Sequence, residues 1–223
     1  MNTTIVKRLM YKEWYFQRWM LVGYFVAGLV SVALLAGGSN ASFYAGTILL
    51  MTAMIAGGVQ LAIIAGVNER TEQTLPFIMT LPVSPREYAT AKIGANVAMF
   101  FVPWGLLSLA TLAIFSASPD GRGLIPFASL LLIEMFASFC LVLGAAVVTE
   151  SQGWTVGVMI VSNLFLQGFL YYVSHMPEIA NGMRAKVVTW GPNGIALLVA
   201  EVAISVLLLG ITFVVQSRKK NFI

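Results

Sequence analysis

Long hydrophobic runs separated by short polar segments make up most of the chain. There are six such runs, at approximately residues 19–36, 43–67, 93–115, 124–148, 154–173 and 195–216. Each is close to the roughly 20 apolar residues that a helix needs to cross a bilayer. None alternates polar and apolar residues over about ten positions, as a strand of a membrane barrel would. The pattern predicts an all-α membrane protein with six transmembrane helices.

The polar segments between the runs carry an uneven distribution of positive charge. If the N-terminus lies on one side of the membrane, that side receives Lys7, Arg8, Lys12, Arg18, Arg70, Arg86, Lys92, Arg218, Lys219 and Lys220. The opposite side receives only Arg122, Arg184 and Lys186. Lys and Arg gather in the cytoplasmic segments of membrane proteins. Both termini are therefore predicted to be cytoplasmic, in a protein of the cell membrane.

Residues 1–18, before the first run, have an amphipathic pattern of their own. On a helical wheel Ile5, Val6 and Leu9 share one side, and most of the Lys and Arg side chains share the other. This pattern is typical of a basic helix that lies in the membrane interface. Glu13 is an exception, because it falls on the apolar side.

Composition supports a single membrane domain over residues 1–223. Hydrophobic residues are 59% of the chain and charged residues 10%, against about 25% charged in soluble domains. One cysteine, Cys140, and one histidine, His175, cannot form an internal disulfide, a cysteine-cluster metal site or a histidine-based zinc site. The net charge of +4 does not indicate nucleic-acid binding, since in a membrane protein the position of the charges matters more.

Sequence motifs for nucleotide binding and hydrolysis are missing from the chain. It contains no G-x-x-x-x-G-K-[ST], H-E-x-x-H or G-x-S-x-G, which mark phosphate loops, zinc proteases and serine hydrolases. Enzymatic activity, a resident cofactor and a metal site therefore have no support in this chain.

One cytoplasmic segment, ERTEQTLPFIMTLPVSPREYATAK at residues 69–92, is unusually polar and rich in proline. Pro76 suits the first position of a short helix and Pro82 ends it. That helix is too short to be stable alone, so it must pack against something. Ser84-Pro85-Arg86-Glu87 then forms a capping box that starts the next helix. A short helix between two rigid spans suits a mechanical coupler.

Several residues within or beside the runs are candidates for packing or function. Gly58, Ala62 and Gly66 form a small-residue face, which could pack within one subunit or between subunits. Glu134 and Glu201 are acids inside hydrophobic runs. Placing an acid in the membrane costs free energy, so both are candidates for a functional role. Structural pairing competes with function for both, and Glu201 could simply reach the interface. Outside the membrane, Pro177 to Thr189 is predicted to form a short amphipathic helix.

The polar segment and the six runs resemble the permease subunits of ABC type-2 transporters. In that family the corresponding segment ends in a P-V-S-x-x-E/Q pattern followed by G-K. Here it is Pro82-Val83-Ser84-Pro85-Arg86-Glu87, then Ala91-Lys92, with alanine where glycine is frequent. The motif covers about 25 residues, and the topology covers nearly the whole chain.

The resemblance implies a set of partners. Residues 71–81 would form the coupling helix, seated in a groove of a separate cytoplasmic ATPase that binds ATP and Mg²⁺, with the N-terminal helix beside the same ATPase. Two ATPases and two permeases, as a homodimer, would make the transporter. The coupling residues would be Glu69, Arg70, Glu72, Leu75, Phe77, Ile78, Met79, Arg86 and Glu87.

The resemblance also implies a path between the two permeases, lined by the second and fifth spans. By position, this points to Thr52, Met54, Gln60, Asn163 and Gln167. These side chains are apolar or amide-like, which favours a lipophilic cargo such as a peptide or a drug-like molecule. Two other hypotheses stay open: a stand-alone membrane immunity or scaffold protein, and an ion-coupled carrier that uses Glu134.

Overall fold

The computed structural model describes residues 3–68 and 84–218, and these residues form helices and no strand. Six of the helices are long and apolar enough to cross a membrane. They correspond one to one with the six predicted runs, so the predicted all-α membrane fold is confirmed.

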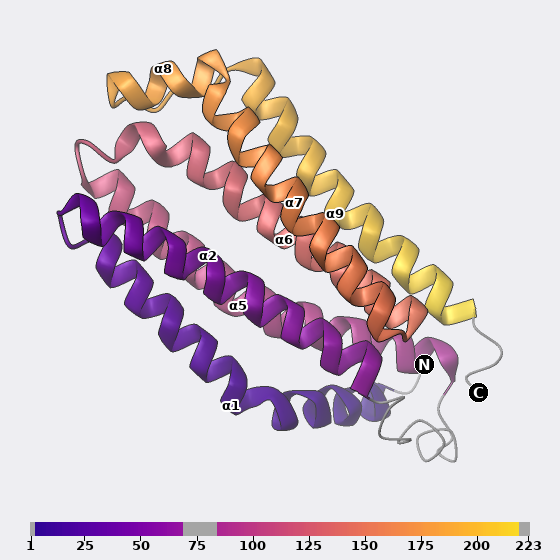
Figure 1. The fold of residues 1–223 in the computed structure, drawn as a ribbon. Helices are drawn as coiled ribbons and strands as arrows, with labels where there is room; N and C mark the ends of the chain where they lie inside the picture. The colour runs from indigo at the N-terminus through magenta and orange to yellow at the C-terminus, as the bar shows by residue number, and fades with distance from the viewer. Residues whose placement is uncertain (1–2, 69–83, 219–223) are drawn as a thin grey trace.

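Apart from the stretch between residues 68 and 85, the elements follow one another with short connections (Figure 1). The spans are α1 (Thr3–Leu35), α2 (Asn40–Ile63) with its π-helical continuation η1 (Ile64–Asn68), α5 (Pro85–Ala117), α6 (Ile125–Thr149), α7 (Gln152–His175) and α9 (Pro192–Arg218). A 3-10 turn, η2 (Arg122–Leu124), precedes α6, and the short α8 (Pro177–Ala185) joins α7 to α9. The predicted helix at Pro177 is therefore confirmed, although it ends before Thr189 because Lys186 adopts a left-handed conformation with φ 56°.

The N-terminal residues differ from the prediction of a separate interfacial helix. Residues 3–18 are the beginning of α1 and continue directly into the first span. No glycine or proline interrupts this stretch, so nothing in the sequence breaks the helix. Figure 1 shows that α1 is bent, and its first part runs across the end of the bundle. An interfacial position for this part stays a prediction.

Helix α6 lies at the centre of the bundle and packs against α2, α5, α7 and α9, while α1 packs against α2 and α5. Aromatic side chains fill the space between α5 and α6, and the rings of Phe100 and Phe139 stack with their centroids 4.1 Å apart. The Trp104 indole N–H, also on α5, donates a 2.8 Å hydrogen bond to the backbone carbonyl of Leu132. The core is therefore continuous from α2 through α6.

The small-residue face of α2 packs inside the subunit. A methyl group added at Gly58 would lie 3.0 Å from the Phe100 ring, and one added at Gly66 would collide with the backbone carbonyl of Ala146. Ala62 is completely buried. Of the two open interpretations of this face, close packing within one subunit is confirmed.

Helix α9 has a pattern opposite to that of a helix in a soluble protein. Its buried residues are all small or polar: Gly194, Glu201, Ser205, Thr212 and Gln216. Its exposed residues include the large apolar side chains Val206, Leu207 and Ile211. Lipid is as apolar as leucine, so small and polar groups are the ones that drive helices together in a membrane.

The ends of the bundle agree with the charge pattern. The first turns of α1, the start of α5 and the last turns of α9 lie at the same end of the bundle (Figure 1), which we call the N-terminal end. The described Lys and Arg residues on these segments are Lys7, Arg8, Lys12, Arg18, Arg86, Lys92 and Arg218, whereas Arg122, Arg184 and Lys186 belong to the connections at the opposite end. Which end faces the cytoplasm stays a prediction.

Candidate functional site

Most of the predicted coupling residues lie outside the described residues. These are Glu69, Arg70, Glu72, Leu75, Phe77, Ile78 and Met79, together with the coupling helix expected at residues 71–81. Arg86 and Glu87, which follow this segment, are described. Arg86 is exposed and Glu87 is buried.

The predicted capping box at the start of α5 is confirmed. The Ser84 side chain accepts a 3.3 Å hydrogen bond from the backbone N–H of Glu87, and the backbone N–H of Ser84 donates to the Glu87 carboxylate at 3.0 Å. The Ser84 hydroxyl also donates to this carboxylate at 2.9 Å, and Pro85 occupies the first helical position. These interactions fix the point at which α5 begins, immediately after residues 69–83.

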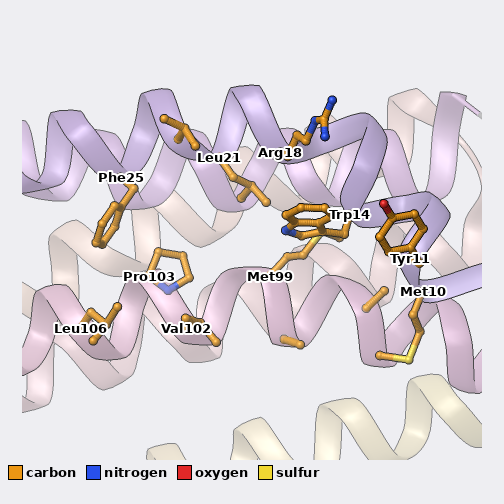
Figure 2. Close-up of a pocket in the computed structure, with 13 residues that line it drawn as sticks. Met10, Tyr11, Trp14, Arg18, Leu21, Phe25, Met99, Val102, Pro103 and Leu106 are labelled. Atoms are coloured by element: carbon orange, nitrogen blue, oxygen red, sulfur yellow. The ribbon is translucent and has the colours of Figure 1, made fainter. Parts of the chain in front are cut away.

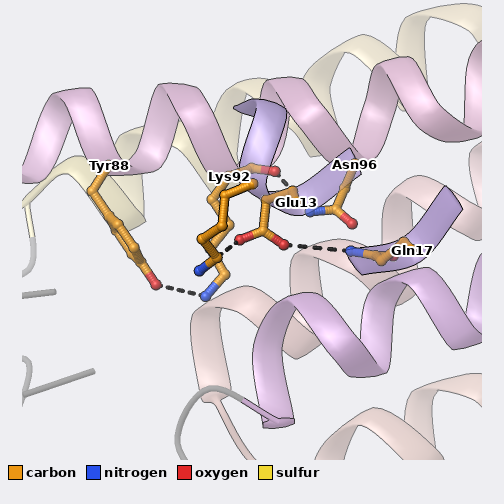
Figure 3. Close-up of polar contacts among 6 residues, drawn as sticks. Glu13, Gln17, Tyr88, Lys92 and Asn96 are labelled. Carbon is orange, nitrogen blue, oxygen red and sulfur yellow. Dashed lines mark hydrogen bonds and ion pairs between the residues drawn. The ribbon is translucent and has the colours of Figure 1, made fainter. Parts of the chain in front are cut away.

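Above this cap, α1 and α5 enclose a group of polar side chains that we call the end cluster: Glu13, Gln17, Tyr88, Lys92 and Asn96 (Figure 3). All five are at most 9% exposed. The Lys92 ammonium donates a 2.6 Å hydrogen bond to the Tyr88 hydroxyl, and the Asn96 amide donates to the Lys92 backbone carbonyl at 2.8 Å. Figure 3 shows the Lys92 side chain beside Glu13, so α1 and α5 meet through buried groups of both charge signs.

The acidic member of the end cluster is held from its own helix as well. Gln17 donates to the Glu13 carboxylate at 3.4 Å, and the Lys12 ammonium lies 3.3 Å from it. The position of Glu13 on the apolar side of the N-terminal helix was the one sequence signal for this cluster. Burial of Lys92 was missed, because a lysine at the edge of a hydrophobic run looks like an ordinary topology signal.

The predicted path residues are brought together only in part. Met54 on α2 and Asn163 on α7 line the same small crevice, together with Ser138 on α6, and its volume is about 30 Å³. Thr52 and Gln167 are exposed and Gln60 is half-buried, all of them outside this crevice. A volume of this size holds about one water molecule. The described residues of one chain therefore leave the crevice too small for a cargo.

The two intramembrane acids form a second buried polar group, which we call the carboxyl pair. Glu134 is the tenth residue of α6 and Glu201 the tenth of α9, so both lie about 14 Å from the same end of the bundle. The two helices pack directly against each other, and both carboxyl side chains are buried, with Glu134 6% and Glu201 4% exposed. The Glu201 side chain is buried in the bundle, so its packing gives no support to the alternative that it simply reaches the interface.

Hydrogen bonding differs between the two acids. Ser138 donates a 2.9 Å hydrogen bond to the Glu134 carboxyl. Both carboxyl oxygens of Glu201 are buried and have no hydrogen-bond partner among the described residues. The described residues also contain no group of three or more His, Cys, Asp or Glu side chains placed to hold a metal ion.

Comparison with known protein families identifies the class to which these six spans belong. The family model of the ABC-2 type transporter matches residues 4–199. The chain therefore belongs to the ABC-2 type transporter family and is a permease, a multi-pass membrane protein of an ABC transporter. No curated protein and no solved structure is similar enough to the chain to count as a match.

Membership in this family identifies the general function of the chain as transport across a membrane. Permeases of this family are the membrane domains of transporters, and they generally work with a separate ATPase. The family model spans the first five transmembrane helices and the beginning of the sixth.

Proposed function

We propose that this permease exports a lipophilic cargo, as a homodimer driven by two copies of a separate ATPase. The chain forms one permease domain in the cell membrane, with both termini in the cytoplasm. ATP and Mg²⁺ bind to the ATPase, and residues 69–92 transmit its motion to the spans. The observation that carries the proposal is the end cluster, in which buried polar side chains of α1 and α5 lie together. It lies at the end of the bundle where α5 begins, directly after residues 69–83.

The packing supports transmission through this end. Glu87 is fixed to Ser84 by the capping box, and Lys92 lies one to two turns further along the same helix. A displacement of the segment before Ser84 therefore acts on the base of α5. Through the buried groups of the end cluster it also acts on α1, because packed interiors transmit strain rather than absorb it.

Two copies of the chain are supported by the small size of the path crevice. Met54 and Asn163 lie in a space of about 30 Å³, and Gln167 on α7 is exposed on the outside of the bundle. An exposed amide on a membrane helix favours a surface that another helix covers. A path between two permeases would be lined by these residues, and their apolar and amide character suits a lipophilic peptide or drug-like cargo.

Co-purification with the ATPase and transport into vesicles test this proposal. Changing Ile78→Asp or Met79→Asp places a charge on the apolar side of the predicted coupling helix. We expect both variants to lose ATPase binding and ATP-driven transport while they still insert into the membrane. Val187→Asp makes the same kind of change at an exposed position in the connection after α8, and it should leave both activities intact.

The opposite outcomes identify the competing functions. Normal ATPase binding by both Ile78→Asp and Met79→Asp would refute coupling through this segment. Transport that continues without nucleotide but stops in Glu134→Gln would indicate an ion-coupled carrier, a function that the buried carboxyl pair could serve. The mass of the intact complex, measured by native mass spectrometry, tests the proposed copy numbers.

A further inference from the structure

A long groove lies between α1 and α5 on the outside of the bundle (Figure 2). Its volume is about 550 Å³, within the range of roughly 300–1,000 Å³ that small-molecule sites occupy. On α5 the lining residues at the N-terminal end are the small Ala95 and Ala98, which leave the space empty. On α1 the larger Trp14, Leu21 and Phe25 form the opposite wall.

The groove changes in polarity along its length. Toward the N-terminal end of the bundle it is lined by Tyr11, Trp14 and Arg18, and toward the middle by Phe25, Pro103 and Leu106. Among the described residues that line it, Arg18 alone carries a charge. The groove is therefore amphipathic, with a cationic end and an apolar end.

Aromatic side chains indicate that the cationic end lies at the level of lipid headgroups. Tyr11, Trp14, Tyr15, Phe16 and Trp19 are all exposed on α1, and tyrosine and tryptophan gather at both interfaces of a membrane. From Ala95 to Leu106 the groove follows α5 for about 17 Å. This length is close to half of the roughly 30 Å hydrocarbon core, so the groove spans one leaflet.

The Arg18 side chain has a hydrogen-bond donor without a partner among the described residues. Its guanidinium carbon lies 4.1 Å from the centre of the Tyr15 ring, and its Nε is buried with no hydrogen-bond partner among the described residues. Figure 2 shows the guanidinium at the rim of the groove formed by α1, turned away from α5. Arginine pairs especially well with phosphate, and Arg18 as a whole is half-buried rather than fully buried, so a phosphate at the rim can approach its guanidinium.

We propose that this groove binds one glycerophospholipid with an anionic headgroup, from the leaflet at the N-terminal end. An acyl chain lies along Leu21, Phe25 and Leu106, and the phosphate pairs with Arg18 at the rim. Charge complementarity favours a lipid over a second copy of the chain, because Arg18, the single charge of the lining, forms no ion pair with another described residue. The lipid fills the space between α1 and α5 beside the end cluster.

Photo-crosslinking in lipid nanodiscs tests the site. The probe is phosphatidylglycerol with a diazirine in its acyl chain, compared with phosphatidylcholine that has the same chain, and peptide mass spectrometry locates the crosslinks on the full-length protein. We expect crosslinks to concentrate on residues 21–25 of α1 and 98–106 of α5. The anionic probe should be preferred by about fivefold, the effect of one basic residue near a membrane surface.

Two substitutions with matched controls separate the headgroup from the acyl chain. Arg18→Gln should remove the preference for phosphatidylglycerol, whereas Arg8→Gln, at an exposed arginine of α1 outside the groove, should keep it. Ala98→Trp fills the groove from an exposed position and should abolish the crosslinks there. Leu109→Trp, on the same helix but outside the groove, should leave them unchanged.

Three results would overturn the proposal. Crosslinks spread evenly over the exposed faces of all spans would mean ordinary surrounding lipid. Equal labelling by the two probes would remove the role of Arg18. Efficient thiol crosslinking of Ala98→Cys to the same position of a second chain, in native membranes, would show that a protein partner covers the groove.

Discussion

The end cluster and the carboxyl pair are both buried polar groups in an apolar bundle, but they differ in the partners available to their buried charges. In the end cluster, acidic and basic side chains from α1 and α5 are buried together, and Lys92 donates to Tyr88 at 2.6 Å. In the carboxyl pair, two acids are buried on the adjacent helices α6 and α9, and the single hydrogen bond to them from a described side chain comes from Ser138. The first arrangement compensates its charge internally, whereas the second does not.

Depth in the membrane accounts for part of the difference. Lys92 is the eighth residue of α5, about 10 Å from the N-terminal end of that helix, and its buried ammonium has the Tyr88 hydroxyl as a hydrogen-bond partner. Glu134 and Glu201 lie about 14 Å from the opposite end, near the middle of a hydrocarbon core of about 30 Å. At that depth an acid is kept only where its role outweighs its cost in stability. We therefore expect the end cluster to stabilise the junction of α1 and α5 through which the proposed coupling acts, and the carboxyl pair to be kept for a reason other than stability.

Removing the cation of the end cluster should have the largest effect on stability. We expect Lys92→Met to lower the free energy of unfolding by about 2–3 kcal/mol. The substitution removes the hydrogen bond to the Tyr88 hydroxyl and the positive charge beside Glu13. Chemical unfolding of the purified protein in detergent micelles measures this change.

Lys186→Met is the matched control for that experiment. Lys186 also makes a 2.6 Å contact, with Asp120, but both side chains are more than half exposed. Exposed ion pairs contribute about 0–1 kcal/mol, so this variant should remain close to the wild type. Equal losses for the two lysines would remove the distinction between the buried cluster and an ordinary surface pair.

Replacing an acid by methionine should have opposite signs in the two regions. Glu13→Met removes the acceptor of Gln17 and the partner of Lys12, and it should destabilise the protein. Glu201→Met removes a carboxyl group with no partner among the described residues, and it should stabilise the protein by about 1–2 kcal/mol. The midpoints of thermal unfolding in the same detergent give the order of the two variants.

A loss of stability in Glu201→Met would change the interpretation of the pair. It would mean that Glu201 has a partner outside the described residues, such as an ion, a water molecule or a second subunit. Transport assays on the same variant separate these cases, because loss of ATP-driven export without loss of folding would assign Glu201 to the path.

How much of this could be predicted from the sequence depends on the range of the interaction. The six spans and the capping box of Ser84 and Glu87 follow from patterns within a few residues of each other, and both are confirmed. The orientation of Glu201 and the burial of Lys92 depend on which distant helix packs beside them. Residue spacing within one helix carries no such information, so these two features could not be predicted.

The smallest expected effect concerns the one hydrogen bond that the carboxyl pair receives from a described side chain. Ser138→Ala removes the 2.9 Å bond to Glu134 and should cost about 1 kcal/mol in the free energy of unfolding. Ser129→Ala, on the same helix, removes only a bond from a hydroxyl to the backbone carbonyl of Ile125. Such bonds contribute little to a helix, so this control should be nearly neutral. Equal stability of the two serine variants would show that Ser138 does not support Glu134. The carboxyl pair would then have no stabilising contact from a described side chain. That result would favour an ion, a water molecule or another subunit as the partner of the pair.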